Sequence, residues 1–200
     1  MEKFDVCVIG AGPSGFAAAM RAIDFGKRVA LVERNKVGGA GIFDGALSSK
    51  TLWELSESYQ LTHNTNLGYT VYDSEVHFSS VMHQAHRAVA EKHVQLKKQI
   101  SYFQKTGQLS FFNGHAKFTS KNEIDITDAE GAKQTIWAEN TVMAVGSRPR
   151  YLPNIPIDEK IILTSDGVSS LPDFPKSIVI LGAGVIGCEF ATIFSNFGKT

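Results

Sequence analysis

Cysteine is scarce in this sequence: among its 200 residues, only Cys7 and Cys188 carry a thiol. Both lie in apolar segments far apart in the chain, so we expect reduced core residues, as is typical of a cytoplasmic protein. Long hydrophobic runs are also missing. This excludes a membrane-spanning helix, because such a helix needs about 20 apolar residues. The N-terminus enters a strand pattern at once, so no signal peptide is expected.

An excess of charge of either sign is missing as well. Twenty basic and twenty acidic side chains give a formal net charge of zero. Neither nucleic acid nor a membrane surface is therefore expected as the main partner. Apolar residues make up 43% of the chain, which is ordinary for a globular protein with a sizeable core. The length accommodates one large domain or two small ones.

The N-terminal segment carries the pattern of a dinucleotide-binding unit. A short strand predicted over residues 4–9 runs into Gly10-Ala11-Gly12-Pro13-Ser14-Gly15, which fits G-x-G-x-x-G. A helix is predicted over residues 16–25 and a second strand over residues 29–32, followed by Glu33. A strand, a glycine turn, a helix, a second strand and a terminal acid together form a βαβ unit.

Each glycine of this turn has a physical role. Gly10 permits the tight turn, Gly12 lets the backbone approach a pyrophosphate, and Gly15 lets the helix pack against the strand. Free N–H groups at the helix start bind phosphate oxygens, and the carboxylate of Glu33 can accept hydrogen bonds from a ribose diol. The alternative is a glycine turn without a ligand, which the two strands and the acid in register disfavour.

The same pattern recurs near the end of the chain. The segment "VIGAGPSGFAAAMRAIDFGKR" aligns without gaps with "ILGAGVIGCEFATIFSNFGKT", which contains Gly182, Gly184 and Gly187. A strand is predicted over residues 178–181 and a helix over residues 185–197. The sequence ends before the position that corresponds to Glu33. The residue at that position determines whether NAD or NADP is preferred, so the sequence leaves this preference open. We expect these residues to be the N-terminal piece of a longer enzyme.

Two helices are predicted between the repeats, over residues 48–62 and 79–104, with an irregular polar segment at 63–78. His83 and His86 lie one turn apart on the second helix. A metal site needs more ligands than this pair, so no metal is expected and a solvated helix face is the favoured interpretation.

Short strands are predicted over residues 109–138, with turns at Asn113-Gly114 and at 128–131. A buried strand is predicted over residues 141–145. The proline-containing segment at 150–176 has the character of a linker. The sequence thus predicts an α/β fold: a doubly wound nucleotide-binding unit with a small β-meander, followed by the opening of a second unit.

Two further motifs complete the picture: "GG…G…SK", from Gly38 to Lys50, and "AVGSRPR", which precedes the second fingerprint. With the two fingerprints, they make the chain resemble the flavoprotein pyridine nucleotide-disulfide oxidoreductases, especially the dihydrolipoamide dehydrogenases. The segment "GAGVIGCEFATIF" resembles the soluble pyridine nucleotide transhydrogenase branch. The resemblance implies FAD at the first fingerprint and NAD(P) at the second. It divides the chain into an FAD-binding domain (1–150), a linker (151–176) and the start of an NAD(P)-binding domain (177–200).

The resemblance also implies site residues, with Glu33 at the adenosine ribose and residues 114–116 near the adenine. The positions implied for FAD are Gly10, Gly12, Pro13, Ser14, Gly15, Glu33, Arg34, Gly38, Gly39, Lys50, His115, Ala116, Ala144, Gly146 and Ser147. Those implied for the nicotinamide nucleotide are Gly182, Gly184 and Gly187. Val145 is a mild departure from the family's Ala-Thr-Gly or Ala-Cys-Gly.

The redox loop departs from the family more strongly. Laid on the usual Gly-Gly-Thr-Cys-(four residues)-Cys-(two residues)-Ser-Lys, the two cysteines fall on Gly41 and Ala46. Neither residue can form a thiolate or carry electrons. An engineered replacement is disfavoured, because Phe43, Asp44 and Ser48 differ from the family pattern too.

The Ser-Lys ending is retained, and the resemblance places Lys50 beside the flavin with Glu189 beside the lysine. We therefore expect Lys50 and Glu189 to pair and to be the catalytic residues. The alternative is an exposed lysine and a helix-surface glutamate near a favourable dipole end.

Together these features predict an FAD-dependent oxidoreductase that passes electrons from NAD(P)H to an unidentified acceptor without a redox disulfide. Two alternatives within the family are a dihydrolipoamide dehydrogenase homologue with a lost disulfide step and a soluble transhydrogenase. A further alternative is a non-catalytic FAD-binding protein. The resemblance implies a homodimer for the full-length protein.

Overall fold

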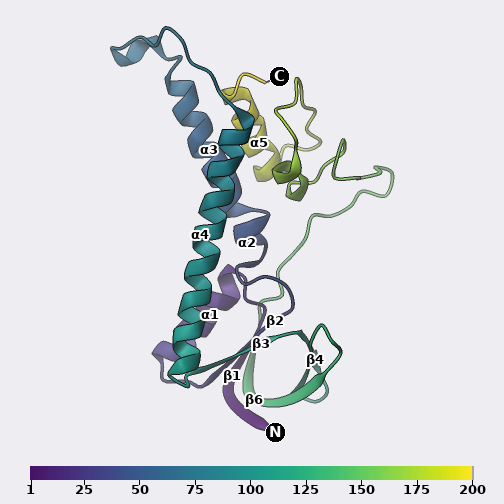
Figure 1. The fold of residues 1–200 in the computed structure, drawn as a ribbon. Helices are drawn as coiled ribbons and strands as arrows, with labels where there is room; N and C mark the ends of the chain where they lie inside the picture. Colours follow the sequence, from purple (N-terminus) through teal and green to yellow (C-terminus); the bar gives the residue numbers. More distant parts are fainter. Residues whose placement is uncertain (200) are drawn as a thin grey trace. The chain divides into compact units, whose positions relative to one another are not determined.

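The structure is a computed structural model, and it describes residues 1–199 (Figure 1). These residues form two compact units. The first unit comprises Met1–Phe43 and Glu91–Arg148, and the second comprises Asp44–Ala90 and the chain from Pro149 onward. The domains predicted from the motifs are defined by the ligand that each would bind, whereas the two units are defined by compactness. The domain boundaries therefore remain a prediction.

The described part of the first unit is built on a six-stranded sheet in the order β3-β2-β1-β6-β5-β4. The parallel strands are β1 (Glu2–Ile9), β2 (Val29–Glu33), β3 (Leu109–Asn113) and β6 (Lys133–Met143). The antiparallel strands are β4 (His115–Phe118) and β5 (Glu123–Thr127), which pair with each other and with β6. This mixed sheet with its helices confirms the predicted α/β fold and β-meander.

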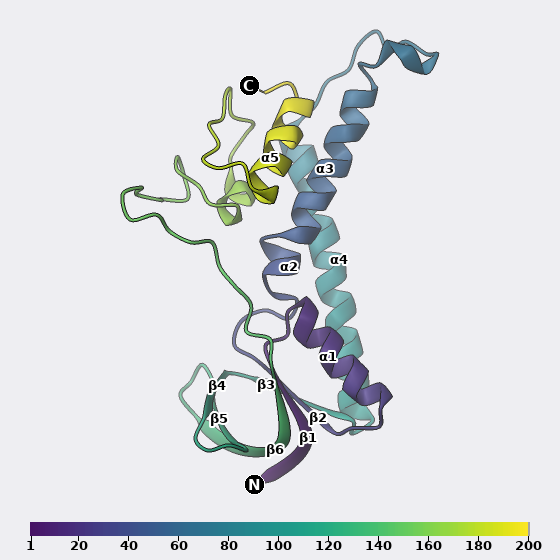
Figure 2. The same cartoon turned by 180° about the vertical axis from the view of Figure 1, so that it is seen from behind.

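Burial explains the parallel part of the sheet. All five residues of β2 are buried, and Cys7 and Val8 of β1 are fully inaccessible, as expected of strands covered on both faces. Helix α1 (Pro13–Asp24) lies against β1 and β2 (Figure 2). It buries Gly15, Ala19 and Ile23, which recur at the helical period. The predicted βαβ unit is therefore present.

The antiparallel strands complete the same core. Ile124 and Ile126 alternate with less buried residues along β5, which is the period of a strand with one face in the core. The turn between β3 and β4 requires Gly114, because a Cβ there would lie 2.6 Å from the carbonyl oxygen of Thr127. The core cluster contains Phe4, Cys7, Ile9, Ala30, Val32, Ile124, Ile126, Ile136 and Ala138.

The second unit is mainly helical. Its described elements are α3 (Ala46–Leu61), η1 (Thr65–Leu67), the first part of α4 (Phe78–Lys105), η2 (Asp166–Ser170) and α5 (Val185–Asn196). Helices α3 and α5 pack side by side (Figures 1 and 2). Its core consists of Leu52, Phe78, Val81, Met82, Ala85, Ile193 and Phe197. Helix α2 (Gly39–Phe43) belongs to the first unit.

The strand predicted over residues 178–181 is not formed. This segment has no strand partner among the described residues, and Val179 and Leu181 are 86% and 71% exposed. Strand propensity alone cannot hold an extended segment, because ladder hydrogen bonds come from a neighbouring strand. The strand prediction is therefore wrong for this structure.

A separate buried strand over residues 141–145 is also wrong. Strand β6 runs without interruption to Met143, and Val142, Met143 and Val145 are exposed. Strand β5 pairs with β6 only as far as Trp137, so the last part of β6 has β1 alone as its described neighbour. The apolar composition of this segment was mistaken for burial.

The two cysteines have different environments. Cys7 is buried in the sheet, as predicted, whereas Cys188 is exposed on α5, so its prediction as a core residue is wrong. Helix α5 directs Ile193 into the core, Phe197 directly after the helix joins the same cluster, and Cys188 lies outside this apolar stripe. Within residues 1–199, no helix is long and apolar enough to cross a membrane.

Candidate functional site

The first glycine turn is closed by contacts between backbones. Gly10 has φ +103°, and its N–H donates to the carbonyl of Val32 at 2.7 Å. A Cβ at Gly10 would collide with the carbonyl of Ala144, and one at Gly15 would collide with the carbonyl of Gly10. These two glycines therefore let the ends of β1 and β6 and the start of α1 approach closely.

Gly12 faces open space instead. Apart from its chain neighbours, no atom of the described residues lies within 4 Å of a Cβ placed on Gly12. No described side chain caps α1, and its first turn carries no acid. The N–H groups at this helix end remain available, and the positive end of the helix dipole favours an anion. The turn therefore fits a pyrophosphate.

Glu33 is held in place at the end of β2. It is 8% exposed, its Oε2 accepts a hydrogen bond from the N–H of Ala11 at 2.7 Å, and its Oε1 accepts one from the N–H of Asn35 at 2.8 Å. Each carboxylate oxygen has more than one acceptor site. Glu33 therefore retains the capacity to accept a hydrogen bond from a ribose hydroxyl, while the exposed Arg34 follows it.

The loop that begins at Gly38 is joined to the same turn. The N–H of Gly38 donates to the carbonyl of Ala11 at 2.8 Å, and a Cβ on Gly39 would lie 3.1 Å from the Cα of Gly12. Nδ1 of His93 lies 2.8 Å from the carbonyl oxygen of Val37 and fixes the loop from the side of α4. The loop that begins at Gly38 therefore packs directly against the first glycine turn, within the first unit.

Helix α2 fills the position where the family pattern has its first cysteine. A Cβ on Gly41 would collide with the ring of Pro13. The ring of Phe43 contacts that of His93 at a centroid distance of 5.2 Å, and the Lys36 ammonium lies 5.0 Å from the Phe43 centroid. Any side chain at position 41 requires α2 or Pro13 to move.

The remaining positions implied for FAD lie on neighbouring strand ends. The N–H of Gly114 donates to the carbonyl of Glu33 at 2.9 Å, which places His115 and Ala116 next to the end of β2. The N–H of Ala144 donates to the carbonyl of Ile9 at 2.8 Å. Exposed Gly146 and Ser147 follow Ala144, and Pro13 and Ser14 are exposed at the start of α1. The first unit thus gathers every position implied for FAD except Lys50.

The second glycine turn repeats the backbone of the first. Gly182 has φ +107°, against +103° for Gly10. Gly184 has φ −75° and ψ 175°, against −70° and −176° for Gly12. A Cβ on Gly187 would collide with the carbonyl of Gly182, as at the corresponding position of the first turn. The repeat seen in the sequence is therefore also a repeat in conformation.

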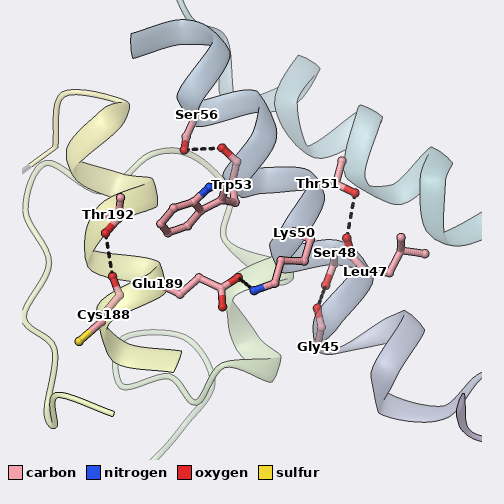
Figure 3. A network of polar contacts seen from close by, with 10 residues as sticks. All are labelled: Gly45, Leu47, Ser48, Lys50, Thr51, Trp53, Ser56, Cys188, Glu189 and Thr192. Carbon is pink, nitrogen blue, oxygen red and sulfur yellow. Dashed lines mark hydrogen bonds and ion pairs between the residues drawn. The ribbon is translucent and has the colours of Figure 1, made fainter. Parts of the chain in front are cut away.

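Lys50 and Glu189 form the predicted pair within the second unit (Figure 3). Nζ of Lys50 lies 2.7 Å from Oε1 of Glu189; the lysine side chain is 63% exposed and the glutamate side chain 11%. Oε1 is buried and accepts no hydrogen bond of good angular geometry from the described residues, so the ammonium is the group that offsets its charge. The pairing is confirmed, and the catalytic role stays a prediction.

A second polar contact between the same helices was missed from the sequence. Ser56 is fully buried, its hydroxyl donates to the carbonyl of Trp53 at 2.8 Å, and Nδ2 of Asn196 donates to that hydroxyl at 3.1 Å. The available signal was a polar residue one turn from Leu52, on the buried side of α3.

Residues 4–200 match the pyridine nucleotide-disulphide oxidoreductase family. The chain belongs to this family. Its curated relatives include a dihydrolipoyl dehydrogenase of Trypanosoma brucei brucei, which is 33% identical over 99% of this chain and 41% of its own length. The mitochondrial dihydrolipoyl dehydrogenase of Bos taurus is 34% identical over 97% of this chain and 38% of its own length. The chain spans about two fifths of the length of these relatives.

Solved structures agree with the family. A copper(II) complex of the HOCl-induced flavoprotein disulfide reductase RclA from Escherichia coli has a TM-score of 0.77 at 25% identity, covering all of this chain and 42% of that one. LpdA from Mycobacterium tuberculosis has a TM-score of 0.84 at 21% identity, covering all of this chain and 43% of that one, and shows the shared fold.

Proposed function

We propose that this protein is an FAD-dependent oxidoreductase that passes electrons from NAD(P)H to an acceptor without a redox disulfide. The observation that carries the proposal is the first glycine turn, where an uncapped helix end, open space at Gly12 and the fixed carboxylate of Glu33 occur together. The absence of cysteine at positions 41 and 46 supports the missing disulfide step.

The first unit would hold FAD through the turn at Gly10–Gly15, with Glu33 at the ribose. Bound FAD supplies hydride acceptance and electron transfer, which no side chain here provides. The glycines allow the backbone to approach the pyrophosphate, and the α1 N–H groups bind its oxygens. The second turn, at Gly182–Gly187, would bind the nicotinamide nucleotide in the same way.

Lys50 would act through its charge. An ammonium beside the reduced flavin favours its anionic form and so raises its reduction potential. Glu189 lies 2.7 Å from that ammonium and offsets its charge.

The second candidate is a dihydrolipoamide dehydrogenase homologue that has lost its disulfide step, and the curated relatives favour descent from that group. Neither candidate reduces lipoamide, because that reaction requires a dithiol relay that Gly41 and Ala46 cannot provide, so lipoamide reduction would refute both.

The test uses the full-length protein, purified and examined by visible absorption. We expect a flavin spectrum, NAD(P)H oxidation with a quinone or dye, and no lipoamide reduction. A colourless protein that cannot be reconstituted with FAD would refute the proposal for the first turn. A flavoprotein that reduces no acceptor would instead be a non-catalytic FAD-binding protein.

A further inference from the structure

Helices α3 and α5 are connected by two polar contacts that lie one after the other along the helices. The first is the Lys50–Glu189 ion pair, and the second is the Ser56–Asn196 hydrogen bond. The residue earlier in each helix pairs with the earlier residue of the other, so the two helices run in the same direction. At 1.5 Å per residue, the two contacts are separated by about 9 Å along α3 and about 10 Å along α5.

These two contacts constrain the helices differently. Lys50 is a long side chain, 63% exposed, and such an ion pair tolerates many geometries and contributes little by itself. Ser56 is fully buried, and its hydroxyl is bonded on both sides, to the Trp53 carbonyl and to the Asn196 amide. A hydrogen bond between two short side chains is directional and fails beyond about 3.5 Å.

The apolar residues between the helices pack closely but hold no single pair of atoms in a fixed geometry. Leu52, Ile193 and Phe197 share one cluster, and apolar contact resists sliding through close packing but is not directional. The indole of Trp53 points toward α5 in the same interface (Figure 3). A shift of α5 by one residue would move Glu189 by about 1.5 Å along the helix axis and rotate it by about 100°. Such a shift would separate its carboxylate from Lys50.

We propose that Ser56 and Asn196 are positioning residues that hold α3 and α5 in the register where Glu189 meets Lys50. The inference rests on the role proposed above for Lys50, but the contact itself can be tested without flavin. Ser58 provides a matched control, because its hydroxyl donates only to the carbonyl of Glu54 in its own helix, at 2.9 Å.

The flavin-free test uses a zero-length carbodiimide, which joins an amine to a carboxylate only where the two are in contact. In the full-length protein, mass spectrometry should find an amide between Lys50 and Glu189. Asn196→Ala and Ser56→Ala should each lower its yield about threefold or more, because a small misplacement removes the contact. Ser58→Ala should leave the yield unchanged. The two variants remove opposite partners of the same hydrogen bond. If one of them fails to fold, the cross-link yield of the other still tests the inference. Equal yields in all variants would overturn the inference.

The flavin-loaded protein separates this inference from the proposed function. Lys50→Met should lower the flavin midpoint potential, and Asn196→Ala should lower it in the same direction while Ser58→Ala does not. If Lys50→Met leaves the potential unchanged, the role of Lys50 is wrong and the cross-link alone decides the positioning. If Lys50→Met lowers the potential but Asn196→Ala changes neither potential nor cross-link, the positioning inference is wrong and the proposed function stands.

Discussion

Position 41 shows at the scale of one residue why a cysteine cannot simply be restored to the loop. A Cβ on Gly41 would collide with the ring of Pro13. We expect Gly41→Cys to lower the free energy of unfolding by about 1–3 kcal/mol, as overpacking does. Urea unfolding measures this change. Pro13→Ala removes the colliding ring, so the double variant should recover part of the loss; an equal loss in both backgrounds would contradict the steric explanation.

The two thiols should differ in reactivity for a physical reason. Burial raises the pKa of the Cys7 thiol to about 12, so its thiolate is negligible near pH 8, whereas Cys188 is exposed. A disulfide reagent should therefore modify one thiol in the native protein and two after denaturation, with Cys188→Ser abolishing the native reaction. Rapid native labelling of Cys7 would show that β1 opens.

At the scale of an element, one carboxylate organises the segment before η2. Oδ1 of Asp158 accepts hydrogen bonds from the N–H groups of Ile161, Lys160 and Ile162, at 2.8, 2.9 and 3.0 Å. These bonds lower the pKa of Asp158 below its usual value. A depressed pKa gives stabilisation that is present above the unfolded pKa, about 4, and is lost as the pH falls through the folded value.

The resulting expectation concerns amide exchange. At pH 6, Asp158→Ala should reduce the hydrogen-exchange protection of the amides of Ile161 and Ile162, because their acceptor is gone. Lowering the pH of the unchanged protein through the depressed pKa of Asp158, which lies below its usual value, should do the same. Protection factors corrected for intrinsic exchange measure both effects. Asp173→Ala is a suitable control, since Asp173 accepts only the N–H of Phe174.

At the scale of the whole molecule, local backbone requirements could be predicted, and so could the Lys50–Glu189 pair, which the family resemblance implied, but other long-range contacts could not. Both glycine turns followed from G-x-G-x-x-G, since positive φ and close backbone approach exclude other residues. The segment at 178–181 was mistaken for a strand because a strand depends on a partner elsewhere in the chain. The exposure of Cys188 depends on how α5 is turned, and the Ser56–Asn196 contact depends on two helices meeting; neither is encoded in a single segment.

The missing strand has a functional consequence at this scale. The second glycine turn follows a segment without described strand partners, so its backbone has little support. The 200-residue chain by itself is therefore expected to show no steady-state oxidation of NAD(P)H, even with FAD and a dye. The absorbance of reduced nicotinamide, followed over time, measures this oxidation. Turnover by a chain of verified mass would contradict the expectation.

Helix α4 has a consequence for how the chain can be cut. Its 28 residues continue through Ala90 and Glu91, where the first compact unit takes over from the second. Proteases cleave extended backbone, so this boundary must unwind before it can enter an active site. Limited digestion should consequently spare the 90–91 bond and cut first in the irregular stretch between η1 and α4, leaving two fragments that each carry pieces of both units.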